Sequence, residues 1–172
     1  MFLNYIKDFS VKRILKNSLQ NSRSNPDSST IKTVGLFVDE SYFLETNTLL
    51  KSLLSQGILE SNIEVIIYND KFKKNKRQSF PACSASNLRW NATVDSNIVN
   101  NFIAQEFDLL ISYYDVEKAV LLLVTHQSKA KFKVGFTAID KRLNDLMINT
   151  NAENHIVFTH EIFRYLKILN KL

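Results

Sequence analysis

The segment 107–136 constrains the fold of this chain more than any other part of the sequence. Residues 107–114 form an apolar run of strand length, residues 115–127 have the apolar content of a helix that packs on a sheet, and residues 128–136 end in a second apolar strand. A strand, a helix and a strand within about 30 residues form a βαβ unit, whose two strands run parallel. The remaining segments are therefore expected to extend a parallel sheet.

The rest of the chain repeats this alternation. The expected strands are residues 33–39, 63–68, 107–113, 131–136 and 145–149, and the expected helices are residues 42–56, 96–105, 115–127 and 152–169. We expect a single three-layer, Rossmann-like or flavodoxin-like α/β domain with a mostly parallel five-stranded sheet in an order of about 2-1-3-4-5. Residues 79–91 are expected to be irregular, because Pro81 cannot serve a central strand, with a short edge segment at Arg89 and Trp90.

Residues 2–20 have the pattern of an amphipathic helix, with apolar residues at steps of three and four and basic residues between them. Three interpretations stay open for it: it packs on the domain, it binds RNA or a protein partner, or it lies on an anionic membrane surface. Residues 21–30 are rich in turn-forming residues and indicate a linker. We therefore divide the chain into a basic N-terminal helix with its linker (1–30) and an α/β domain (31–172).

Length and composition exclude several classes of protein. The chain has 172 residues, of which 45% are apolar, which suits one domain with its own core. No apolar run approaches the ~18–20 residues of a membrane span, and the first ten residues do not resemble a signal peptide. The single cysteine, Cys83, excludes an intramolecular disulfide and a cysteine-rich zinc site. We expect a cytoplasmic protein without a transmembrane segment.

Two short segments carry the basic excess behind the net charge of +5. Residues 1–25 hold five basic residues against one acidic residue, and so do residues 70–77. Such clusters either are solvated or contact a polyanion such as RNA, on which an exposed aromatic ring can also stack. The candidate nucleic-acid-binding residues are Lys12, Arg13, Lys16, Lys71, Lys73, Lys74, Lys76, Arg77 and Trp90. A smaller third cluster consists of Lys129, Lys131 and Lys133.

A second candidate site lies where parallel strands end. Ligands of open parallel sheets bind beyond the carboxyl ends of the strands, and here that rim would carry Asp39, Ser41, Tyr114 and Asp115. We assign no metal to these carboxylates, since an aspartate between a strand and a helix commonly caps the helix. The three glycines stand outside the expected turns between strand and helix, so no phosphate-binding loop, cofactor or catalytic residue is assigned.

Four segments carry a resemblance to known proteins: EFDLLISYY at 106–114, SKAKFKVGF at 128–136, RLNDLMIN at 142–149 and FRYLKILN at 163–170. Together they resemble a functionally uncharacterised family of small α/β proteins from Bacteroidetes, which implies a fold but no activity. The first two segments are also similar to the N-terminal half of heptosyltransferase-type glycosyltransferases. Those enzymes hold a sugar nucleotide between two Rossmann-like domains, whereas this chain has the length of one.

The leading hypothesis is a non-enzymatic cytoplasmic module that binds RNA or a ribonucleoprotein through its basic segments. One alternative is a degenerate nucleotide- or sugar-nucleotide-binding domain that uses the rim residues. The other is a protein-interaction scaffold that uses residues 2–20.

Overall fold

The computed structural model describes residues 10–16, 30–43, 45–70 and 79–172. Within them, a six-stranded sheet has the order β3-β2-β1-β4-β5-β6, and all neighbouring strands pair in parallel. The strands are β1 (Val34–Asp39), β2 (Ile63–Tyr68), β3 (Ala82–Cys83), β4 (Leu109–Tyr113), β5 (Lys133–Phe136) and β6 (Leu146–Ile148). Every residue of β1 and β4 is buried, as expected for central strands that are covered on both faces.

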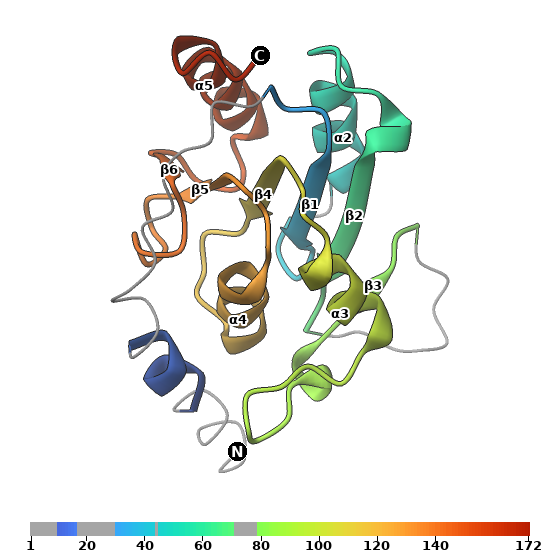
Figure 1. Ribbon diagram of the computed structural model, residues 1–172, viewed down its shortest axis with the longest axis vertical. Helices are drawn as coiled ribbons and strands as arrows, with labels where there is room; N and C mark the ends of the chain where they lie inside the picture. Colours follow the sequence, from blue (N-terminus) through green and yellow to red (C-terminus); the bar gives the residue numbers. More distant parts are fainter. Residues whose placement is uncertain (1–9, 17–29, 44, 71–78) are drawn as a thin grey trace.

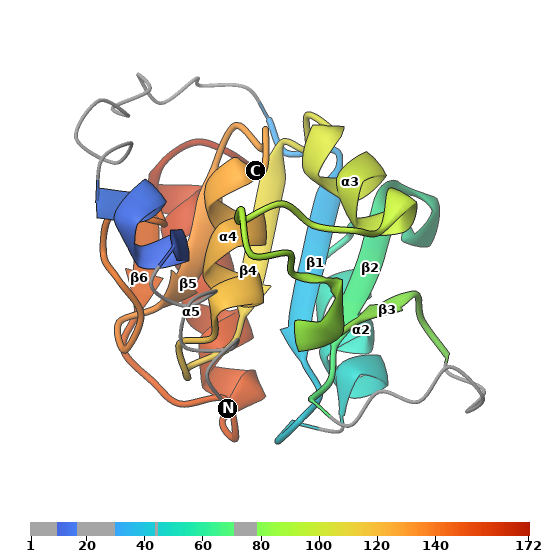
Figure 2. The same ribbon diagram turned by 90° about the horizontal axis from the view of Figure 1, so that it is seen from below.

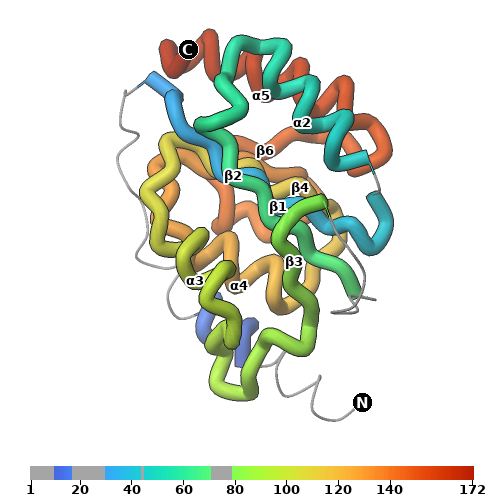
Figure 3. Tube along the Cα trace, turned by 90° about the vertical axis from the view of Figure 1, so that its right-hand side faces the viewer, coloured from blue at the N-terminus to red at the C-terminus, as the bar shows by residue number. Residues whose placement is uncertain are grey.

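Helices cover both faces of the sheet, which gives three layers (Figures 1 and 3). The helices α2 (Thr46–Leu54) and α5 (His155–Ile168) lie on one face, and α3 (Asn97–Ala104) and α4 (Ala119–Gln127) lie on the other. Two short 3₁₀ turns, η1 (Glu60–Asn62) and η2 (Ala85–Asn87), complete the connections. None of the helices in the described ranges has the length and apolar character that crossing a membrane needs.

The helical segment 10–16 packs on the α3/α4 face, beside α4 (Figures 1 and 2). Its side chains Val11 and Leu15 are buried in the same core cluster as Leu88 and Val120. These two apolar positions are four residues apart, so they lie on one face of the helix and the intervening side chains face solvent. The described part of the expected N-terminal unit therefore lies against the α/β domain.

The α/β class and the relative order of the five expected strands are confirmed, but the sheet has a sixth strand. The missed strand is β3, a two-residue edge strand directly after Pro81. A proline is tolerated there because an edge strand needs only one set of hydrogen bonds, and the Pro81 carbonyl accepts the N–H of Ile67 at 2.9 Å. The expectation that residues 79–91 are irregular was wrong at this point.

A glycine in β1 permits the close packing of α3 on the sheet. A Cβ atom at Gly35 would lie 2.7 Å from Cδ2 of Phe107 and 3.0 Å from Cζ of Phe102. The two phenylalanine rings also pack on each other, with centroids 4.9 Å apart. Gly35 is therefore part of the core, not of a phosphate-binding turn.

Candidate functional site

The strand order reverses between β1 and β4, and the carboxyl ends of these strands form the crevice where open α/β sheets bind ligands. A lysine from the β4–α4 loop fills this crevice. The Lys118 ammonium lies 2.7 Å from Oδ2 of Asp39 and 2.7 Å from Oδ2 of Asp70, and it donates a hydrogen bond to the Ser41 hydroxyl at 3.0 Å. The ends of β1, β2 and β4 are thereby joined by one positive charge.

Aromatic rings complete the surroundings of Lys118. Its ammonium lies 4.7 Å from the ring centroid of Tyr42 and 4.9 Å from that of Tyr68, which are distances of cation–π contact. The Tyr68 hydroxyl donates to Oδ1 of Asp70 at 2.7 Å. Lys118 is therefore enclosed by two carboxylates and two aromatic rings.

The electrostatics of this network favour its charged form. Burial alone would lower the pKa of Lys118, but the hydrogen bonds and charges of Asp39 and Asp70 outweigh burial, and the pKa is raised. Burial likewise would raise the pKa of Asp70, but hydrogen bonds from Lys118 and Tyr68 lower it. Both shifts favour the charged forms of Lys118 and Asp70, so these two side chains form an ion pair at neutral pH.

Only two of the four rim candidates meet at the crevice. Asp39 and Ser41 both contact Lys118, whereas the Tyr114 side chain is fully buried and its hydroxyl bonds to Thr125 at 2.7 Å. Asp115 accepts the backbone N–H of Ala152 at 2.8 Å and so holds the loop before α5. In the described ranges, no group of three or more His, Cys, Asp or Glu side chains is arranged to hold a metal ion.

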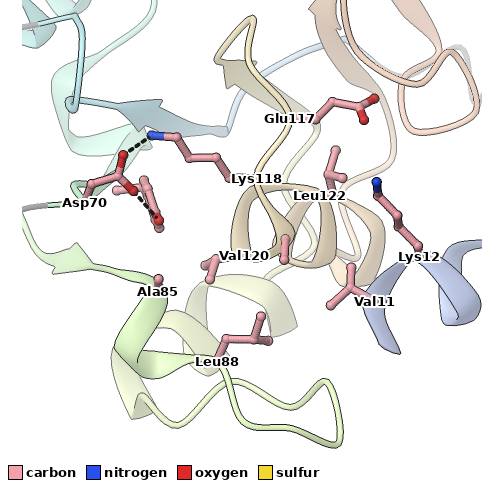
Figure 4. Close-up of a pocket in the computed structure, with 11 residues that line it drawn as sticks. Val11, Lys12, Asp70, Ala85, Leu88, Glu117, Lys118, Val120 and Leu122 are labelled. Atoms are coloured by element: carbon pink, nitrogen blue, oxygen red, sulfur yellow. Dashed lines mark hydrogen bonds and ion pairs between the residues drawn. The ribbon is translucent and has the colours of Figure 1, made fainter. Parts of the chain in front are cut away.

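A cavity of about 370 Å³ lies beside the crevice, on the α4 side of the sheet (Figure 4). Four parts of the chain line it: the helical segment 10–16, the end of β2 with Asp70, the η2 turn with the residue after it, and the start of α4 with the two residues before it. The lining residues are Val11, Lys12, Tyr68, Asp70, Ala85, Leu88, Glu117, Lys118, Ala119, Val120 and Leu122. Aliphatic side chains make most of the wall, and charged side chains stand at its edge.

The three candidate cations of segment 10–16 are exposed. Lys12, Arg13 and Lys16 lie on the solvent side of the helix, because Val11 and Leu15 hold its other side against the core. Lys12 also lines the cavity. This segment thus presents a positively charged face next to the cavity.

Trp90 is also exposed, with 69% of its surface accessible. It lies on a loop that is closed by the antiparallel bridge between Leu88 and Val94 and by an ion pair of 2.8 Å between Arg89 and Asp95. Leu88, at the base of this loop, lines the cavity. The loop that carries the exposed indole ring therefore begins at the wall of the cavity.

The second basic segment lies outside the described residues. It comprises Lys71, Lys73, Lys74, Lys76 and Arg77. The residue directly before it, Asp70, is described and lines the cavity.

The third basic cluster is largely engaged within the domain. Lys131 forms an ion pair with Asp108 at 2.9 Å. The Lys133 ammonium donates to the carbonyls of Thr125 and His126 at 2.8 and 3.3 Å, at the last turn of α4. Burial lowers the pKa of Lys133 to about 8. These two lysines support the fold and add little to a nucleic-acid-binding face.

Sequence reasoning missed two residues of the site, Lys118 and Asp70. Each lies at the end of a helix or strand, and the residues around it form no sequence motif that would identify a functional site. The signal that was present is positional, since both follow strands whose carboxyl ends share one edge of the predicted sheet.

Comparison with known proteins identifies a family. The model of a family described as "Family of unknown function (DUF6913)" matches residues 7–169, which is most of the chain, so the chain belongs to this family. The expected membership of a functionally uncharacterised family is confirmed, whereas an origin in Bacteroidetes stays a prediction. No curated protein matches the chain.

Among solved structures, a mutant of the O-GlcNAc transferase from Thermobaculum terrenum is similar, with 12% sequence identity and a TM-score of 0.36. The alignment covers 77% of this chain but only 26% of that transferase. A likeness at this TM-score carries no argument about fold or function.

Proposed function

We propose that the chain, as a member of that family, is a binding module for RNA, free or within a ribonucleoprotein, and not an enzyme. One observation carries the proposal. Lys12, Asp70 and Leu88 line a single cavity, and each belongs to or adjoins one of the three segments whose charge or aromatic content pointed to RNA. The helical segment 10–16 and the base of the Trp90 loop, which are separate in the sequence, thereby border one cavity.

The cations of segment 10–16 are suited to contact phosphates. Three positive charges, on Lys12, Arg13 and Lys16, stand within about two helical turns and are exposed. The buried anchors Val11 and Leu15 fix the backbone that carries them. A fixed array of cations loses less conformational entropy on binding than a flexible tail does, so it binds a phosphate backbone more tightly.

Trp90 supplies the second kind of contact. Unpaired RNA bases stack on exposed aromatic side chains, largely without regard to sequence. The Leu88–Val94 bridge and the Arg89–Asp95 ion pair hold the Trp90 loop in place, and Trp90 itself is exposed. We therefore assign single-stranded RNA in preference to a duplex.

The two alternatives meet specific obstacles. A nucleotide in the crevice between β1 and β4 would have to displace Lys118 from Asp39 and Asp70, leaving two carboxylates unpaired. A protein partner that used the apolar face of segment 10–16 would have to displace Val11 and Leu15 from the core. RNA binding requires neither displacement.

Titration of a fluorescent single-stranded RNA with the full chain at several salt concentrations tests the proposal. The variant Lys12→Glu/Arg13→Glu/Lys16→Glu should bind at least about tenfold more weakly. Its plot of log affinity against log salt should also be shallower, by about 0.7 for each phosphate that the variant no longer neutralises.

A matched control is Lys32→Glu/Lys51→Glu/Lys167→Glu, which changes the net charge equally at exposed positions away from the cavity. It should bind almost as tightly as the native chain. Absence of RNA binding by the native chain at low salt would refute the proposal, and so would an equal decrease of affinity in both variants, because only net charge would then matter.

A further inference from the structure

The cavity has the chemistry of a site for an uncharged group with an apolar surface. Figure 4 shows aliphatic side chains from three elements around one space, namely Val11, Leu88, Val120 and Leu122. Its volume of about 370 Å³ lies at the lower end of the ~300–1,000 Å³ range of small-molecule pockets. Such a space suits one nucleoside better than a dinucleotide.

Charge argues against a phosphate inside the cavity. The positive charge of Lys118 is offset by two carboxylates, Asp39 and Asp70, each 2.7 Å from its ammonium. The lining also holds one further cation, Lys12, and one further carboxylate, Glu117, so its formal charges sum to zero. A phosphate placed there would lie close to carboxylates without a net positive charge to balance it. An anion therefore interacts more favourably with the outer face of segment 10–16, where Arg13 and Lys16 are exposed.

We infer that the cavity receives one unpaired base of the bound RNA, while the phosphates on either side contact the exposed cations of segment 10–16. The inference rests on the proposed function and deepens it. Bases that leave a stack are held between apolar or aromatic side chains, and the wall formed by Leu88, Val120 and Leu122 provides such a surface. Trp90, on the adjacent loop, then stacks on a neighbouring base.

One carboxylate at the edge of the cavity gives the site a preference among bases. Glu117 accepts the backbone N–H of Asp140 at 3.0 Å, which orients its carboxylate. A carboxylate accepts hydrogen bonds and does not donate them, so it pairs with the exocyclic amino group of adenine, cytosine or guanine. Uracil has no amino group and offers only its ring N–H. The site should therefore prefer a base with an amino group, such as adenine, to uracil.

Filling the cavity tests the inference. Ala85 is exposed and lines the cavity, so Ala85→Phe places a ring in it without changing the core or any charge. This variant should bind a short oligoadenylate about tenfold more weakly, the decrease expected for one unstacked base, with an unchanged dependence on salt. The matched control is Ser86→Phe on the same turn, which is exposed but does not line the cavity and should bind like the native chain.

A second measurement uses the native chain and does not depend on how a variant folds. Adenosine carries no phosphate, so it probes the base site alone. We expect it to shift the backbone amide NMR signals of Ala119 and Val120, and the native chain should bind oligoadenylate more tightly than oligouridylate.

The outcomes separate the two proposals. If Ala85→Phe binds as tightly as the native chain while the variant at Lys12, Arg13 and Lys16 binds more weakly, the base site is refuted and RNA binding stands. Equally weakened binding in Ala85→Phe and Ser86→Phe, unshifted amide signals with adenosine, or equal affinity for the two oligonucleotides would also overturn the base site. If the native chain binds no RNA, the proposed function itself fails.

Discussion

Protonation of Lys133 lowers the stability of the folded chain. Burial lowers its pKa to about 8 from the ordinary value of 10.5. Between these two values the unfolded chain binds the proton and the folded chain does not, so the contribution of Lys133 to the free energy of unfolding rises with pH across this window. A neutral amine still has two N–H groups, enough for the carbonyls of Thr125 and His126.

We therefore expect the variant Lys133→Met to be relatively more stable than the native chain below pH 8 and to lose that advantage as the pH rises toward 10. Urea unfolding at several pH values measures the difference in the free energy of unfolding between the two proteins. Burial raises the pKa of the Cys83 thiol to about 12, so this thiol titrates near pH 9 only in the unfolded chain. The effect is the same in both proteins, and the difference between them isolates Lys133. A difference that does not change with pH would contradict the prediction.

The site could be predicted in part at the scale of single residues. Asp39 and Ser41 lie at the expected edge, because the end of a buried strand is visible in the sequence as the point where an apolar run stops. Lys118 could not be assigned, because its partners lie 48 residues away at Asp70 and 77 residues away at Ser41. Tyr114 was expected at the rim of the sheet, but its side chain is buried. Its hydroxyl forms a hydrogen bond with the hydroxyl of Thr125 in α4, and this bond makes burial of the polar group possible.

At the scale of elements, the sequence predicted the five longer strands and their order but missed β3. Short, mainly apolar stretches identify β1, β2 and β4 without any tertiary information, although Gly35, Glu64 and Ser112 interrupt them. The strand β3 has only two residues, and no local pattern marks it. It exists because β2 has an open edge, where the N–H of Asn69 donates to the carbonyl of Cys83 at 3.0 Å.

The helical segment 10–16 links stability to the proposed RNA binding. Leu15 anchors it in the core cluster, so Leu15→Asp should release it and lower the free energy of unfolding by about 3 kcal/mol. RNA affinity should fall at the same time, although no cation is removed, because Lys12 and Lys16 are then no longer held in place. Urea unfolding and the RNA titration measure the two effects.

The neighbouring residue supplies the control for this prediction. Ile14 is 36% exposed, and Ile14→Asp introduces the same charge one position away. Ile14→Asp should lower the free energy of unfolding by less than about 1 kcal/mol and leave the affinity for RNA almost unchanged. If Leu15→Asp lowered stability but left RNA affinity intact, the fixed position of segment 10–16 would be irrelevant to binding.

At the scale of the whole molecule, the sheet brings together what the sequence keeps apart. Lys12 of segment 10–16, Asp70 after β2 and Leu88 at the base of the Trp90 loop line one cavity. The sequence indicated these parts of the chain separately, by their positive charge or by an aromatic residue. Their common location depends on the parallel pairing of β2 with β1 and of β1 with β4, which no single segment encodes.

The ion pairs of Lys118 have a consequence for the rates of folding and unfolding. Lys118 reaches Asp39 and Asp70 only after β1, β2 and β4 have assembled, since its partners are far away in the sequence. Contacts of this kind form late, so they slow unfolding more than they speed folding. A Lys118→Met variant should therefore unfold about tenfold faster in stopped-flow experiments and refold at nearly the native rate. A slower refolding rate with unchanged unfolding would contradict this order of events. The ion pairs of Lys118 would then set the lifetime of the folded state by limiting the rate of unfolding.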